Sequence, residues 1–304
     1  MTHAFTRIAL AALLAAPLLA APVRARTQDN GAHTPAKLAS ACAGRDGWAD
    51  PAPPAHVFAN VWYVGTCGIT VLLVTSKDGH VLLDGGPAEA APLVLANIAA
   101  LGFKPGDVRW ILSSHEHHDH VGALAALQRA TKAKVAVLRA AGPVMKTGKP
   151  LASDPQAGLI EGFDPVAVDR LLDDGDSVIV GGSAFTVHAT PAHSPGSASW
   201  TWQSCTPDFT CRMIAYADSA TAISADDYRF TDHADRIAAV RKGVARIAAM
   251  PCDILLTPHP GASDMMERFS GDAPLVDPAA CKAYAAAAGK RFDDRLKQEA
   301  GKRP

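Results

Sequence analysis

The stretch His115-Glu116-His117-His118-Asp119-His120 places four histidines within six residues. It follows the short, β-favouring run 108–112 and precedes the apolar run 121–127, which has the pattern of a helix start. The sequence therefore predicts that this cluster lies on a strand-to-helix loop, where a rigid scaffold commonly presents chemistry.

The spacing within the cluster favours two metal ions over one. His115 and His117 are two residues apart, so in an extended loop both imidazoles point the same way. Asp119 and His120 follow where the chain turns into the helix, and they are expected to aim at a neighbouring point. Imidazole and carboxylate together suit zinc, with iron or manganese as weaker candidates. A solvated, histidine-rich loop is the plain alternative, and the position between a strand and a helix argues against it.

Two further histidines lie in comparable surroundings. His193 lies in the segment 190–197, and His259 lies in the segment 255–263. Each follows a β-like run and sits in a turn rich in proline and glycine. Both are therefore candidates for the same metal site.

Three motifs together resemble the metallo-β-lactamase superfamily: HxHxDH at 115–120, TPxHxPGS at 190–197 and TPHPGAS at 257–263. The last motif, with Tyr216-Ala217-Asp218-Ser219 before it, resembles subclass B3, and the matching segments run from about Val57 to Ser263. The resemblance implies an αββα sandwich, with two central β-sheets flanked by helices. The pattern of strands and helices alone indicates a mixed α+β fold with more than one sheet.

The resemblance implies six ligands for two zinc ions: His115, His117 and His193 for the first, and Asp119, His120 and His259 for the second. A zinc pair of this kind shares a hydroxide that opens the β-lactam amide, and Asp119 helps to orient it. Two residues depart from the usual pattern, because Ala192 replaces a common glycine and Ser194 a common threonine. Neither change removes a ligand.

The same resemblance assigns residues that bind the substrate. Ser219 and Thr221 are expected to bind the substrate carboxylate through their hydroxyls. Gln156, in an irregular stretch near the expected site mouth, corresponds to a glutamine that some relatives use. The implied substrates are small-molecule β-lactam antibiotics, namely penicillins, cephalosporins and carbapenems.

Other readings of the motifs remain open at this point. A lactonase or a glyoxalase-like thioesterase of the same superfamily has an Asp that bridges both metals, and Asp218 lies in that neighbourhood. A zinc-binding protein without catalysis is a third possibility. Among supporting groups, Asp84 is either a turn residue or a support for the metal loop. Glu116 is expected at the rim or behind the ligands, and His118 is expected to face away.

Residues 1–25 have the pattern of a secretory signal peptide. Arg7 is the positive charge, 8–16 is the apolar core, and 23–25 is a small-residue cleavage site. A membrane anchor is the alternative, but the apolar run is short and interrupted by proline. We therefore expect a periplasmic protein without membrane association after cleavage, whose residues 26–304 form one domain.

The six cysteines of the chain indicate disulfides in an exported protein, and six cysteines allow 15 pairings. A cysteine zinc site is disfavoured because no CxxC spacing occurs. The resemblance favours nearest-neighbour pairing: Cys42–Cys67, Cys205–Cys211 and Cys252–Cys281. The formal net charge of −1, without a basic block, argues against nucleic acid as a partner. We expect a monomer.

The periodicity along the chain predicts further elements, with a loose lead-in before residue 55. Strands are expected at 60–66, 69–75, 80–83, 108–112, 134–138, 177–180, 184–189, 198–203, 212–216 and 254–257. Helices are expected near 37–42 and at 88–101, 122–131, 232–249 and 278–299. Asp232 is expected to cap the helix at 232–249.

Overall fold

The computed structural model describes residues 1–2 and 31–301. The predicted signal peptide therefore lies almost wholly outside the described residues. Within the described ranges, no helix is both long and apolar enough to cross a membrane.

Two β-sheets form the centre of the molecule. The first has seven strands in sequence order: β1 (Ala55–Phe58), β2 (Val61–Tyr63), β3 (Leu72–Val74), β4 (His80–Leu83), β5 (Val108–Leu112), β6 (Lys134–Leu138) and β7 (Arg170–Leu172). The second has five strands in the order β12-β11-β10-β9-β8: β8 (Ser177–Val180), β9 (Ser183–Ala189), β10 (Ala198–Cys205), β11 (Cys211–Tyr216) and β12 (Ile254–Leu256).

Strands with two apolar faces explain why the sheets are buried on both sides. In β3, Leu72 belongs to the core between the two sheets, whereas Leu73 belongs to a second core beneath helices. Successive side chains of a strand point to opposite faces, so a continuous apolar run serves two cores at once. The large indoles of Trp200 and Trp202 on β10 fill the core between the sheets.

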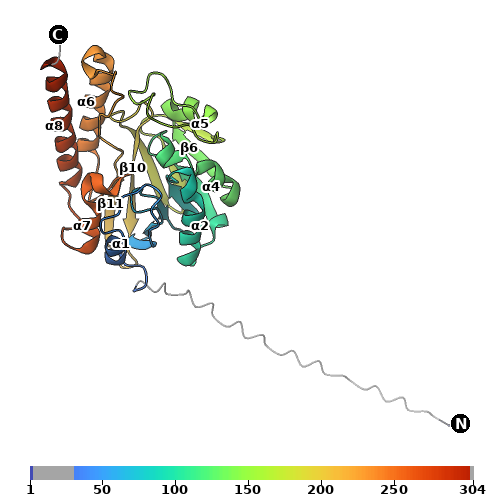
Figure 1. Cartoon of the computed structure of the whole chain (residues 1–304). Coiled ribbons are helices and arrows are strands. Elements are labelled where there is room, and N and C mark those ends of the chain that lie inside the picture. The colour runs from blue at the N-terminus through green and yellow to red at the C-terminus, as the bar shows by residue number, and fades with distance from the viewer. Residues whose placement is uncertain (3–30, 302–304) are drawn as a thin grey trace.

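Helices cover the outer face of each sheet (Figure 1). The described helices are α1 (Pro35–Ala41), α2 (Ala91–Ala100), α3 (His118–Val121), α4 (Leu124–Thr131), α5 (Gly142–Thr147), α6 (Ala234–Ala249), α7 (Met265–Ser270) and α8 (Ala280–Gly301). Helices α2 and α4 pack on the first sheet, and α6 and α8 pack on the second. The layers are thus α, β, β and α, which confirms the predicted fold class.

The structure differs from the sequence prediction in a few elements. Strands β1 and β7 were not predicted, because proline-rich sequence precedes the first and a charged turn follows the second. The helix expected at 122–131 is confirmed as α4, which begins at Leu124, and the separate short helix α3 before it was not predicted. Asp232 does not cap α6: the cap position is His233, and Asp232 instead lies in a short 3-10 turn, 3.7 Å from Arg229.

Three disulfides join the cysteines that the resemblance paired. They are Cys42–Cys67, Cys205–Cys211 and Cys252–Cys281. The first attaches the segment after α1 to the turn between β2 and β3. The second closes the hairpin of β10 and β11, and the third attaches α8 beside β12.

Candidate metal centre

The topology brings three histidine-bearing loops together. The HxHxDH stretch follows β5, and α3 begins at His118, so Asp119 and His120 lie in the first turn of that helix. Strands β9 and β11 are both antiparallel to β10, and β12 is parallel to β11. The carboxyl ends of β9, β11 and β12 therefore share one edge of the second sheet. Their following loops carry His193, Ser219 and His259.

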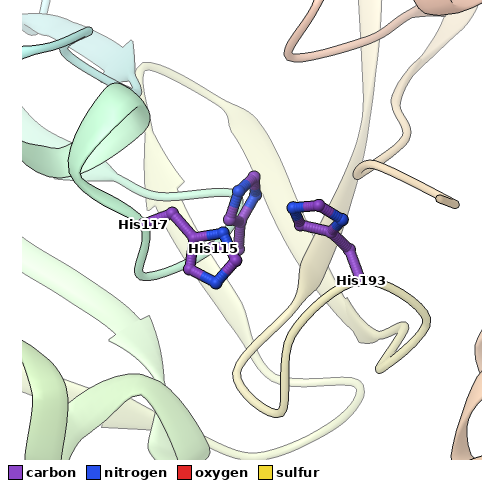
Figure 2. A group of neighbouring side chains, drawn as sticks. All are labelled: His115, His117 and His193. Atoms are coloured by element: carbon purple, nitrogen blue, oxygen red, sulfur yellow. The ribbon is translucent and has the colours of Figure 1, made fainter. Parts of the chain in front are cut away.

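Three histidines form the first group, which can hold a metal ion: His115, His117 and His193. One nitrogen from each lies within 4.8 Å of the others, and all three residues are buried. Figure 2 shows the imidazoles facing one another, with His115 and His117 on one loop and His193 on another. The predicted first trio is thus assembled across two loops.

Each histidine of this trio has a partner on its other ring nitrogen. His115 Nδ1 lies 2.8 Å from Asp218 Oδ1, and His117 Nε2 lies 2.9 Å from Asp154 Oδ2. His193 Nδ1 lies 2.8 Å from the carbonyl oxygen of Thr221. A carboxylate or carbonyl acceptor places the proton on the nitrogen that it contacts, which leaves the opposite nitrogen with a lone pair.

The remaining nitrogens fit a metal ion. His115 Nε2 is buried and has no hydrogen-bond partner in the described part of the chain. Among the described residues, the hydrogen-bond partner of His193 Nε2 is the amide nitrogen of Gln156, at 3.3 Å. Buried polar atoms normally have a hydrogen-bond partner. A buried imidazole nitrogen without one, beside other imidazoles, is therefore a candidate zinc ligand, because zinc prefers nitrogen donors of this kind.

Burial keeps His115 and His193 neutral, whereas at His117 burial is outweighed by the hydrogen bond to Asp154, which raises the pKa. Burial and the nearby His115 and His117 lower the pKa of His193 to about 3. Burial, with the nearby His120, also lowers the pKa of His115 well below its ordinary value. Metal ions bind neutral imidazole, so no proton has to leave these two rings before binding.

The second group lies beside the first. Asp119 Oδ2 is 3.0 Å from His120 Nε2 and 3.3 Å from His259 Nε2, and the two imidazole nitrogens are 3.1 Å apart. Burial raises the pKa of Asp119, but the adjacent His120 outweighs burial and lowers it. The His259 side chain is 30% exposed, against 0% for His120 and 7% for Asp119. Solvent therefore reaches the centre at His259.

Asp84 supports the metal loop, which decides between its two predicted roles. Its backbone has a positive φ of 61°, and its side chain is fully buried. One oxygen accepts from the backbone nitrogen of Ser114 at 2.6 Å. The other accepts from Tyr216 Oη at 2.7 Å and lies 3.4 Å from His120 Nδ1. This carboxylate joins the first sheet, the second sheet and a candidate ligand.

Two of the three predicted substrate residues, Thr221 and Gln156, contact His193 of the first trio. Ser219 is buried, and its hydroxyl has no hydrogen-bond partner among the residues that the structure describes. The Thr221 hydroxyl lies 3.0 Å from His193 Nδ1. The carbonyl oxygen of Thr221 contacts the same nitrogen. Gln156 is buried and reaches His193 directly.

Two contacts at the candidate centre were not predicted from the sequence: that of Asp154 with His117, and that of Trp48 with His118 and His259. Asp154 lies in a stretch that reads as irregular, and only the fold brings it to His117. The ring of Trp48 is 5.6 Å from that of His118 and 6.0 Å from that of His259. His118 belongs to neither candidate metal trio, and its Nδ1 is buried without a hydrogen-bond partner among the described residues.

Comparison with known proteins agrees with this centre. Residues 64–263 match the Metallo-beta-lactamase superfamily. The crystal structure of the metallo-β-lactamase MIM-1 from Novosphingobium pentaromativorans is 65% identical, with a TM-score of 0.87, over 88% of this chain and 99% of that one. MEM-A1, a subclass B3 metallo-β-lactamase from a soil metagenome library, is 38% identical, with a TM-score of 0.81, over 84% of this chain and 100% of that one.

The curated relatives match a shorter part of this chain. A hydroxyacylglutathione hydrolase of Anaeromyxobacter dehalogenans is 33% identical over 141 residues, 46% of this chain and 44% of that protein. The chain spans less than half the length of the first curated relatives that it matches. The chain belongs to the metallo-β-lactamase superfamily. Within it, the chain is similar in structure to subclass B3 enzymes.

Proposed function

We propose that this protein hydrolyses the β-lactam amide of penicillins, cephalosporins and carbapenems with two zinc ions. One would be held by His115, His117 and His193, and the other by Asp119, His120 and His259. The single observation that carries the proposal is the position of the second trio, with mutual distances of 3.0–3.3 Å, directly beside the first. A paired centre of this kind suits hydrolysis without an activated serine.

Zinc held by these residues would supply an acidic water, with a pKa of about 7, and a Lewis acid for the amide carbonyl. The ionised carboxylate of Asp119 can accept a hydrogen bond from that water and orient it. In the overall reaction one water is consumed and the amide C–N bond breaks. The carbonyl carbon becomes a carboxylate, and the nitrogen takes a proton.

The hydroxyls at the end of β11 support recognition of an anionic substrate. The Ser219 hydroxyl, which has no hydrogen-bond partner in the described part of the chain, can donate to a carboxylate. Thr221 can accept from His193 and still donate its own proton, so its role in binding is compatible with its contact. Gln156 would give up its contact with His193 Nε2 when a metal binds there, which would free its amide for substrate.

A glyoxalase-like thioesterase or a lactonase is the second candidate, because a hydroxyacylglutathione hydrolase and an N-acyl homoserine lactonase match part of the chain. That reading requires Asp218 to bridge the metals. Asp218 instead contacts Nδ1 of His115, on the side of the ring away from the orphaned Nε2. Its Oδ2 is likewise buried without a hydrogen-bond partner in the described ranges, so Asp218 deserves direct mutation.

The remaining expectations form part of the proposal. We infer export to the periplasm after removal of residues 1–25, a single domain over 26–304 and a monomer. The three disulfides support an oxidising compartment.

One experiment tests the proposed activity. Purified protein is assayed with a carbapenem, a cephalosporin, a lactone and a thioester, each with and without EDTA. We expect rapid β-lactam loss that chelation abolishes and zinc restores. Cleavage of the lactone or thioester without β-lactam loss would transfer the function to the second candidate.

A further inference from the structure

Glu116 connects the two loops that carry the first trio. It lies between His115 and His117 in sequence, and its residue is only 3% exposed. Its Oε2 accepts from Ser194 Oγ at 2.7 Å, and its Oε1 accepts from the backbone nitrogen of Gly196 at 2.9 Å. Both partners follow His193, so one buried carboxylate joins the loop after β5 to the loop after β9.

A buried cation holds the same loop from the preceding side. Arg236 on α6 donates from Nη1 to the carbonyl oxygen of Pro191 at 2.7 Å and from Nη2 to that of Ala192 at 2.9 Å. Arg236 is 7% exposed. His193 is therefore fixed between two charged contacts, one on the residues before it and one on the residues after it.

The close approach of Glu116 explains the glycine in this loop. A Cβ at Gly196 would lie 2.4 Å from Glu116 Oε2 and 2.8 Å from the Cα of Ala141. Any side chain there would force the carboxylate or the neighbouring backbone away. Ser194 occupies a position where threonine is common. Its hydroxyl oxygen also lies within hydrogen-bond distance of Ser197 Oγ, at 3.1 Å.

We propose that Glu116 is a positioning residue that holds the His193 loop against the His115–His117 loop, so that the first trio is assembled before metal binds. This inference rests on the proposed metal centre. Ordering a ligand loop during folding removes that cost from binding, so a preassembled trio binds metal more tightly than a loose one. The carboxylate contacts Ser194 and Gly196, which follow His193, and in this proposal it acts through the position of that histidine.

The test compares three variants with the full-length mature enzyme. Glu116→Ala removes both contacts and leaves the Gly196 N–H without its acceptor. Glu116→Gln keeps an amide oxygen for Gly196 and a group that can pair with Ser194. Ser194→Ala removes only the hydroxyl contact. Glu267→Ala, at an exposed glutamate on α7, is the matched control.

Zinc affinity at each site is measured by competition with a chromophoric chelator, alongside the cobalt(II) spectrum and the melting temperature of the metal-free protein. We expect Glu116→Ala to weaken zinc binding at the first site by about 10- to 100-fold, the range for groups that orient metal ligands. The second site should be unchanged. Glu116→Gln should be close to wild type, and excess zinc should restore the turnover of Glu116→Ala.

Two results would overturn the inference. The first is wild-type zinc affinity at both sites in Glu116→Ala. The second is an equal loss at both sites that follows a lowered melting temperature, because that would be a general packing defect. If Glu116→Ala does not fold, selective first-site weakening in Ser194→Ala supports the inference, and wild-type affinity rejects it. A wild-type enzyme that binds fewer than two zinc ions would instead reject the proposed function itself.

Discussion

Replacing Asp218 with asparagine separates the two candidate functions. Asp218 Oδ1 lies 2.8 Å from His115 Nδ1, and both side chains are fully buried. If this carboxylate only orients His115, Asp218→Asn keeps a neutral acceptor and affects the first metal site alone. If Asp218 bridges both metals, the same variant weakens both sites together.

The expected size follows from the contact that changes. A hydrogen bond to a charged group contributes about 1.5–3 kcal/mol, and one between neutral groups about 0.5–1.5 kcal/mol. Loss of the charge therefore costs about 1–1.5 kcal/mol. Since 1.4 kcal/mol corresponds to a factor of ten, zinc affinity at the first site should fall about tenfold.

The assay is zinc titration of the metal-free protein against a chelator, with Asp78→Asn as control. Asp78 is an exposed carboxylate in the hairpin between β3 and β4, so its replacement should leave both affinities unchanged. A loss at both sites in Asp218→Asn, or no loss at either, would refute the orienting role of this carboxylate.

Two further predictions concern the candidate metal centre, and a third concerns the first disulfide. His259→Ala should lose second-site zinc and most turnover while the fold survives, and unchanged zinc content by elemental analysis would reject the assignment. Ser219→Ala should mainly raise KM for β-lactams, because a carboxylate anchor acts on ground state and transition state alike; steady-state kinetics would contradict this by showing a fall in kcat alone. Replacing Cys42 and Cys67 by serine opens a 25-residue loop and should cost about 3.5 kcal/mol in urea denaturation; an unchanged midpoint would count against the entropic estimate.

The sequence pattern predicted most of the strands because they have two apolar faces, whereas the layered αββα arrangement was implied only by the family resemblance. Runs such as Leu72–Val74 and Leu82-Leu83 are typical of buried strands, and the structure shows them buried. Short edge elements were missed because they carry little periodicity. Strand β7 has only three residues, and two of them are exposed.

The candidate metal ligands could be predicted from the sequence, whereas the residues that position them could not. Histidines in a compact motif have a spacing that chemistry alone can interpret. Asp154 and Glu116 act on histidines or loops 37 and 78 residues away, respectively. No local pattern encodes a contact at that separation, so these roles become visible only when the two loops meet.

The origin of the candidate ligands in both sheets has a consequence for the cell. The ligands before β6 belong to the first sheet, and those after β9 and β12 belong to the second. A zinc ion that needs ligands from both sheets would bind only the folded protein. Its binding would shift the folding equilibrium toward the folded state by mass action. Free zinc at 100 times its dissociation constant would add about 2.7 kcal/mol of stability. Zinc starvation would therefore lower the abundance of this protein as well as its activity, because more of the chain would be open to proteolysis.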